Sequence, residues 1–147
     1  MVDVQVEVED KPVVQAKAYE FDVANYYFVY GDFAEARKRM TPIWEQQCGV
    51  TPFGYKAWDR LKSMAAFENN IEETRRLGEA SLKKSCALNE EQKQLEEGNA
   101  KEVISKGYYI DAYRAYQEAD KMAPGPEKAA AWRKAGALYK AALEKAP

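Results

Sequence analysis

The sequence predicts an all-α protein, a right-handed α-solenoid of three helix pairs followed by a C-terminal capping helix. Apolar side chains recur at three- and four-residue steps along most of the chain, which is the period of amphipathic helices. The same pattern returns at a constant offset of 38 residues, which is typical of repeat proteins. The 147 residues are enough for one such array and too few for several independent domains.

The repeat is visible in landmark residues that match without gaps at this offset. Each unit has a turn-prone residue, a large apolar residue two positions later, a small residue, and a terminating residue. In that order the landmarks are Gly31, Asn69 and Gly107; Phe33, Ile71 and Tyr109; Ala36, Thr74 and Ala112; Cys48, Cys86 and Pro124. Glycine and asparagine tolerate positive φ, so we predict a tight turn inside each repeat. The predicted repeats span 17–50, 55–88 and 93–126.

In the first repeat, one helix ends at Gly31 and the next begins after Asp32. Asp32 is a good N-cap, and Glu35 stands three residues later, at the spacing of a capping box. Pro42 lies inside the second helix, where it removes a backbone hydrogen bond and predicts a bend. The glycines within 49–54 are interpreted as the end of this helix and the start of the next.

The second repeat is predicted to turn at Asn69 and Asn70, and the third at Lys106 and Gly107. Residues 123–126, Ala-Pro-Gly-Pro, are a strong helix terminator. A last helix over 127–145 has no partner helix after it, so we expect it to cap the array. The repeat domain thus covers 14–147. Residues 1–13 are predicted to be a flexible acidic arm, with pairing to the edge of a partner's sheet as the alternative.

The composition argues against most catalytic chemistry. The chain has no histidine, which removes triads with an imidazole base and most transition-metal sites, and two cysteines cannot complete a zinc site. With 22 basic and 24 acidic side chains, no positive field attracts nucleic acid. No apolar run approaches the ~18–20 residues that span a bilayer. We therefore expect a protein that is not an enzyme, needs no cofactor or metal, binds no nucleic acid and does not insert into membranes.

Clusters of basic residues recur on the second helices, at 37–39, 75–76 and 83–84. Glutamates stand close to them in sequence, so we interpret these clusters as solvated, partly neutralised helix faces.

The repeats resemble the tetratricopeptide repeat, whose pattern is W-x2-L-G-x2-Y followed by a small residue, an aromatic residue, an alanine and a proline. The matching residues are Ala24, Tyr27, Gly31 and Ala36 in the first unit; Trp58 and Leu61 in the second; and Ala100, Gly107, Ala112, Tyr116, Ala119 and Pro124 in the third. The second unit departs from the pattern at Lys62, Thr74 and Gly78. The offset of 38 residues also exceeds the usual 34.

Tetratricopeptide-repeat proteins bind partners in a concave groove lined by the first helix of each repeat. The resemblance therefore implies a scaffold that binds a protein or peptide partner, either an extended peptide or an amphipathic helix. The residues in register with this groove are Phe21, Asn25, Phe28, Lys56, Asp59, Ser63, Phe67, Glu97, Lys101 and Ile104. An exposed patch of Phe21, Phe28 and Phe67 would favour binding over a plain solvated face. The alternative function is a structural spacer that assembles through its terminal helices, although we favour a monomer.

Cys48 and Cys86 occupy equivalent ends of consecutive second helices. Equivalent points on packed helices lie about 8–10 Å apart, beyond the Cα separation of about 7 Å that a disulfide allows. Both cysteines, however, stand beside flexible residues at helix ends, so a disulfide is favoured over two buried thiols. A disulfide indicates an oxidising compartment, whereas reduced thiols fit the cytoplasm.

The tract CGVTPFGYKAW at 48–58, followed by SCA at 85–87, resembles repeat proteins of the cell envelope of gliding deltaproteobacteria, including motility-machinery scaffolds. This resemblance implies a periplasmic or outer-membrane-associated location and a place in a larger motility or secretion machine. The cytoplasm is the alternative location.

Overall fold

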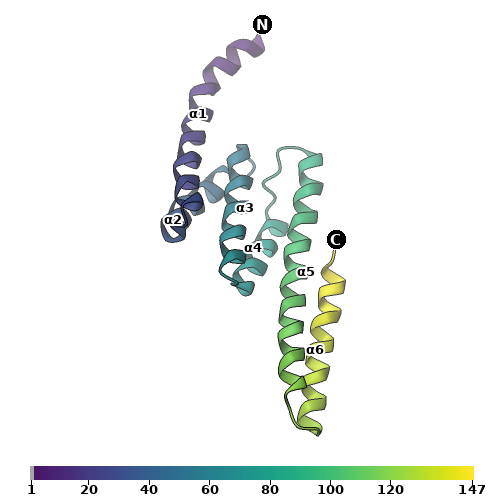
Figure 1. The fold of residues 1–147 in the computed structure, drawn as a ribbon. Helices are drawn as coiled ribbons and strands as arrows, with labels where there is room; N and C mark the ends of the chain where they lie inside the picture. Colours follow the sequence, from purple (N-terminus) through teal and green to yellow (C-terminus); the bar gives the residue numbers. More distant parts are fainter. Residues whose placement is uncertain (1) are drawn as a thin grey trace. The chain divides into compact units, whose positions relative to one another are not determined.

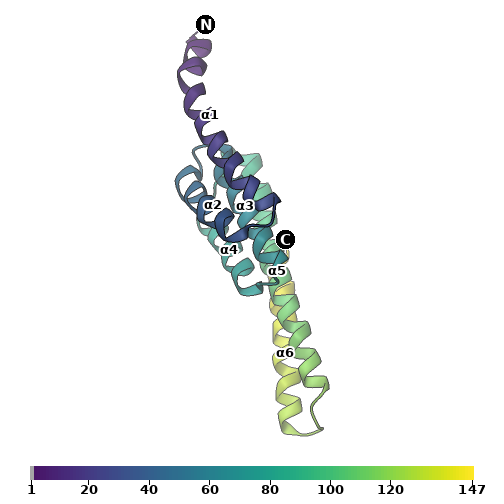
Figure 2. The ribbon, with the colours of Figure 1, turned by 60° about the vertical axis from the view of Figure 1, so that its left-hand side comes forward.

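The computed structural model is all-α over the residues that it describes, as the sequence predicts (Figure 1, Figure 2). The backbone is described for residues 2–147 and the side chains for residues 15–147. The helices are α1 (Val2–Val29), α2 (Phe33–Gln47), α3 (Pro52–Phe67), α4 (Ile71–Lys83), α5 (Glu90–Asp120) and α6 (Pro126–Lys145). Residues 2–13, where the sequence predicts a flexible acidic arm with sheet-edge pairing as the alternative, form the first part of α1 in the structure.

The chain divides into two compact units. Unit 1 comprises Met1–Met64 together with Ser85–Lys93, and unit 2 comprises Ala65–Lys84 together with Gln94–Pro147. Unit 1 therefore contains α1, α2 and most of α3. Unit 2 contains α4, α6 and most of α5.

The turns from α1 to α2 and from α3 to α4 have the same backbone structure. Gly31 and Asn69 end the first helices with positive φ angles of 83° and 57°. The N–H of Asp32 donates a hydrogen bond to the carbonyl of Tyr27, five positions back. The N–H of Asn70 donates the equivalent bond to the carbonyl of Ala65, and both distances are 2.9 Å. These are the bonds of a Schellman motif. The repeat seen in the sequence is therefore present in the local structure of the first two turns.

Each of these turns also caps the helix that follows. The side chain of Asp32 accepts a hydrogen bond from the N–H of Glu35 at 3.3 Å, and that of Asn70 accepts one from the N–H of Glu73 at 3.2 Å. The capping oxygen satisfies a backbone donor that has no partner inside the helix. This bond starts α2 and α4 where the sequence predicts second helices.

The third predicted turn, at Lys106 and Gly107, does not exist, because α5 runs uninterrupted from Glu90 to Asp120. The position equivalent to the two caps is Tyr108, whose long side chain is not an N-cap. Glycine inside a helix costs about 1 kcal/mol relative to alanine, which neighbouring contacts can offset. Gly107 is buried, and a Cβ there would lie 3.5 Å from the Cβ of Arg75 on α4.

The helix predicted over 127–145 is present as α6. It was expected to cap a third helix pair, but because α5 is one continuous helix, α6 is instead the second helix of the pair α5–α6. The terminator at 123–126 ends α5 upstream, and Pro126 is the first residue of α6. The two helices lie side by side in both ribbon views. The hydroxyl of Ser105 donates a hydrogen bond to the carbonyl of Ala142 at 2.8 Å, and the rings of Tyr116 and Trp132 are 4.8 Å apart.

In unit 1, α3 lies against the α1–α2 pair. Trp58, Met40 and Met64 are among the largest fully buried side chains. Gly54 allows the start of α3 to approach the end of α2, since a Cβ there would lie 2.5 Å from the backbone nitrogen of Cys48. No larger residue fits this position without displacing backbone.

Cys48 and Cys86 form a disulfide within unit 1, with their Cα atoms 4.3 Å apart. The bond favoured from the sequence is therefore confirmed. The helix-to-helix spacing does not prevent it, because Cys48 follows the last residue of α2 and Cys86 lies in the non-helical segment between α4 and α5. The bond attaches the segment Ser85–Lys93 to the rest of unit 1.

Candidate functional site

Arg60 on α3 brings together residues that the sequence places in the groove. Its Nε donates a hydrogen bond to Oδ1 of Asn25 at 2.8 Å, and its Nη1 donates one to Oδ2 of Asp59 at 3.0 Å. The centre of its guanidinium lies 5.5 Å from the Phe28 ring centroid and 5.7 Å from that of Phe21. These distances are in the range of cation–π attraction. One guanidinium therefore joins α1 to α3.

The helical period explains why three residues of α1 reach the same partner. Phe21, Asn25 and Phe28 stand four and three positions apart, so they share one face of α1. The Arg60 side chain is 31% exposed, so part of it remains in contact with solvent. A guanidinium has five N–H donors, more than the contacts with Asn25 and Asp59 use. The cluster can therefore offer further donors to a carbonyl or carboxylate.

Phe21, Phe28 and Phe67 do not form the exposed apolar patch that would have favoured partner binding. Phe21 is only 6% exposed and packs against Phe53, with the ring centroids 5.6 Å apart. Phe28 is half-buried, and its ring stacks on Phe33 at 6.0 Å. Phe67, at the end of α3, is 79% exposed. Two of the three rings are thus used to pack helices against one another, because the face of α1 that carries them is turned toward its neighbours.

The remaining predicted residues of α3 have different environments. Lys56 is exposed, with its Nζ 5.3 Å from the centre of the Phe53 ring. Asp59 also pairs with Lys62, at 3.2 Å. The hydroxyl of Ser63 donates to the backbone carbonyl of Asp59 at 2.9 Å, so this hydrogen is used within the helix. Of these, Lys56 is the best placed to contact a partner.

In unit 2 the structure brings two of the three predicted residues of α5, Lys101 and Ile104, to one groove and leaves Glu97 outside its lining. Glu97 is exposed, whereas Ile104 is only 2% exposed. Lys101 and Ile104 line a groove of about 310 Å³ with Glu79 of α4 and Glu144 of α6. Its lining combines charged side chains of both signs with the apolar Leu82 and Ile104.

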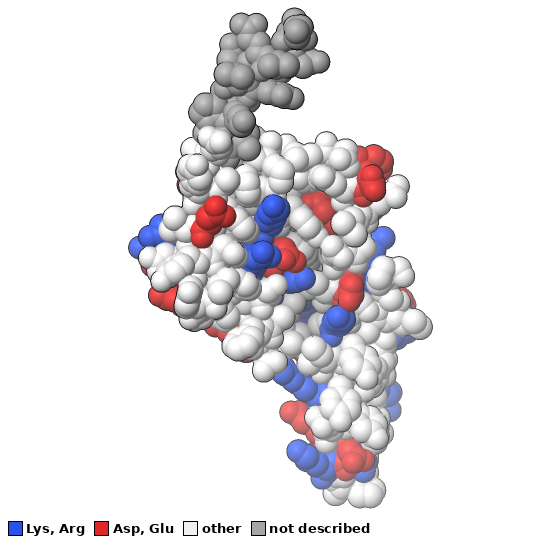
Figure 3. All heavy atoms as spheres, turned by 45° about the horizontal axis from the view of Figure 1, so that its top comes forward, with Lys and Arg blue, Asp and Glu red and all other residues white. Residues whose placement is uncertain are grey.

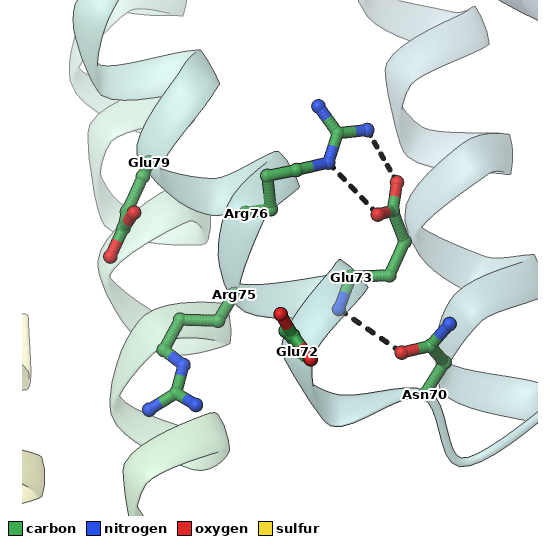
Figure 4. Close-up of a pocket in the computed structure, with 6 residues that line it drawn as sticks. All are labelled: Asn70, Glu72, Glu73, Arg75, Arg76 and Glu79. Atoms are coloured by element: carbon green, nitrogen blue, oxygen red, sulfur yellow. Dashed lines mark hydrogen bonds and ion pairs between the residues drawn. The ribbon is translucent and has the colours of Figure 1, made fainter.

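A second concavity of unit 2, of about 500 Å³, lies along α4 (Figure 4). Two nitrogens of Arg76 bond the two carboxylate oxygens of Glu73, and this hydrogen bonding raises the pKa of Arg76 above its ordinary value. Arg75 instead reaches Asp111 of α5 at 2.7 Å and lies 4.5 Å from the centre of the Tyr108 ring. The basic pair 75–76 is therefore engaged by neighbouring carboxylates.

The cluster at 37–39 shows the same neutralisation, since Nε of Arg39 lies 3.0 Å from an oxygen of Glu35. Acidic and basic side chains are interspersed on the face drawn in Figure 3. The interpretation of the basic clusters as partly neutralised helix faces agrees with these pairs.

Sequence reasoning did not identify Arg60. A signal was available, because Arg60 stands between Ala57 and Leu61, two apolar residues at the helical spacing of a buried face. A long cationic side chain at the edge of such a face lays its stem on apolar neighbours and extends its head to polar partners.

No group of three or more potential metal-ligating side chains occurs among the described residues. In the same part of the chain, no helix combines the length and apolar character needed to cross a membrane. No protein-family model matches the sequence, and comparisons with curated proteins and with solved structures give no match.

Proposed function

We propose that this chain is a non-enzymatic protein–protein interaction module that binds a peptide or helix along the first helices of its repeats. The observation that carries the proposal is the convergence on Arg60. The tetratricopeptide resemblance implies that Asn25, Phe28 and Asp59 share a surface, and all three contact this guanidinium. A cluster held from two helices is preorganised, which lowers the entropic cost of binding a partner.

Membership of the tetratricopeptide-repeat class, with a right-handed solenoid, is part of the proposal. Its support is the pair of matching turns at Gly31 and Asn69, each with the same backbone bonds and a capping side chain. The continuous α5 departs from the repeat plan, so the third pair consists of α5 and α6.

We also propose an envelope location, periplasmic or associated with the outer membrane, within a larger motility or secretion machine. The disulfide supports it, because such bonds persist in oxidising compartments. The test is a thiol count on protein from its native host, alkylated while denatured and without reductant. Unmodified Cys48 and Cys86 support the envelope, whereas two alkylated thiols support the cytoplasm.

Peptide binding is tested with a random-peptide display library panned on the full chain. Selected peptides are labelled and titrated against wild type, Arg60→Met and Lys56→Met. Lys140→Met is the matched control, since Lys140 is an exposed lysine on α6. We expect Arg60→Met to weaken binding at least about tenfold, the effect of losing a charge-assisted hydrogen bond. Lys56 is exposed and lies over the Phe53 ring, so Lys56→Met reports on the surface even if Arg60→Met disturbs folding. Equal affinity of all four proteins would exclude this surface.

A further inference from the structure

An open groove of about 590 Å³ lies between α1 and α2 in unit 1. Tyr19 and Val23 line it from α1, and Pro42 and Ile43 line it from α2. Tyr19 is 64% exposed and Val23 is 45% exposed, so large apolar side chains face solvent here. We call this surface the α1–α2 groove.

The repeat shows what covers this kind of surface. Each α1 residue that lines the groove has a counterpart 38 positions later on α3, and every counterpart is buried. Ala16, Tyr19, Glu20 and Val23 correspond to Gly54, Ala57, Trp58 and Leu61. The last three counterparts are 0%, 1% and 6% exposed. The same face is thus open on the first repeat and closed on the second.

In unit 1, that face of α3 is packed against a helix pair, α1 and α2. Gly54 meets the end of α2 at a distance that leaves no room for a Cβ, and the neighbouring Phe53 contacts Phe21 of α1. Because α1 is the counterpart of α3 in the repeat, the α1–α2 groove corresponds to a surface that a second helix pair covers.

On α1 and α3, the face on which an apolar residue lies, and not its type, decides whether it is buried. Val29, further along α1, is 66% exposed, and its counterpart Phe67 on α3 is 79% exposed. Val23 and Val29 are therefore a matched pair on one helix. The counterpart of Val23 is covered in the second repeat, and the counterpart of Val29 is not.

We propose that the α1–α2 groove binds the α5–α6 hairpin of a second copy of this chain. This hairpin is the last helix pair along the described chain, and it also has large apolar side chains exposed to solvent. Tyr109 and Tyr113 of α5 are 56% and 48% exposed, and Leu143 of α6 is 77% exposed. Contact between two different surfaces is heterologous, so it builds closed rings or open chains of molecules. This association does not depend on peptide binding at Arg60.

Sedimentation velocity of the full chain, from about 1 μM to about 500 μM, tests the association. We expect the weight-average mass of the wild type to rise with concentration. Val23→Glu is expected to weaken association at least about tenfold, because it replaces an apolar side chain of the groove with a carboxylate that must lose water on contact. Val29→Glu is expected to behave as the wild type. Tyr19→Glu, at a more exposed position, repeats the test if Val23→Glu alters the far-UV circular dichroism.

Mixing two variants identifies the surfaces that meet. Val23→Glu disables the groove and Leu143→Glu disables the hairpin, so each alone is expected to stay monomeric. Their mixture is expected to form one-to-one dimers, because it retains one intact groove and one intact hairpin. A wild type that is monomeric throughout, equal effects of Val23→Glu and Val29→Glu, or no dimer in the mixture would each overturn the proposal. None of these results depends on the peptide titration.

Discussion

Removing the disulfide between Cys48 and Cys86 should lower the free energy of unfolding by about 4 kcal/mol. The bond closes a loop of 38 residues. In the chain-entropy model, a loop of this length loses about 13 cal/mol/K in the unfolded state, which is about 4 kcal/mol at 25 °C. The perturbation is the double variant Cys48→Ala/Cys86→Ala, together with reduced wild type, which keeps both sulfur atoms and so isolates the bond itself.

Loss of the disulfide should also have a local effect, on the segment Ser85–Lys93 that the bond attaches to unit 1. Within Ser85–Lys93, Cys86 is the one buried side chain. The capping bond from the N–H of Gln92 to the side chain of Asn89 lies within the segment and does not anchor it elsewhere. Amide hydrogens of Ser85–Lys93 should therefore exchange faster in the reduced protein, while those of α3 change less.

Urea unfolding followed by far-UV circular dichroism measures the global effect. For an m-value of about 2 kcal/mol/M, the midpoint should fall by about 2 M in both altered forms. Reductant should leave the double variant unchanged, which controls for effects of the reagent. A loss below about 1 kcal/mol in both forms would refute the reasoning, since the unfolded chain would then already be constrained without the bond.

Three further predictions concern packing, the cluster and pH. Gly54→Ala should destabilise the protein by about 1–3 kcal/mol, because its Cβ would collide with backbone at the end of α2. A Cβ at Gly136 would meet nothing within 4 Å, so Gly136→Ala should stabilise the protein by about 1 kcal/mol. Urea midpoints of the two variants that shift in the same direction would contradict this contrast. A double-mutant cycle of Asn25→Ala and Arg60→Met should give a coupling of about 1 kcal/mol, and additive effects would show that their hydrogen bond contributes nothing. Burial and neighbouring tyrosines raise the pKa of Tyr139, so the folded state favours its neutral form. The contribution of this group to the free energy of unfolding is therefore complete below about pH 10 and is lost as the pH rises further. Tyr139→Phe should make the alkaline loss of stability shallower, and an unchanged slope in urea titrations at several pH values would exclude this origin.

The sequence by itself determined the elements whose causes are local. Asp32 and Asn70 cap helices through their own side chains, and Gly31 and Asn69 adopt positive φ more easily than most residues do. The start of α6 at Pro126 depends likewise on nearby residues. These features need no knowledge of distant contacts, and for this reason the all-α class and the first two turns could be predicted.

The turn at Gly107 was predicted wrongly because only half of its local signal was present. Glycine permits a turn, but no capping residue follows it, so the helix continues and its hydrogen bonds are kept. The absence of a cap at Tyr108 could have been read from the sequence. The burial of Gly107 beside Arg75 of α4 could not.

Only the tertiary structure decided which helix faces are covered. Phe21 and Val23 are both apolar residues on α1, yet Phe21 is buried at Arg60 and Val23 lines an open groove. A helical pattern shows which residues share a face but not what lies opposite them. Long-range packing therefore placed Arg60 against two aromatic rings of α1 and left the α1–α2 groove open, and it brought Cys86 close enough to Cys48 for the disulfide.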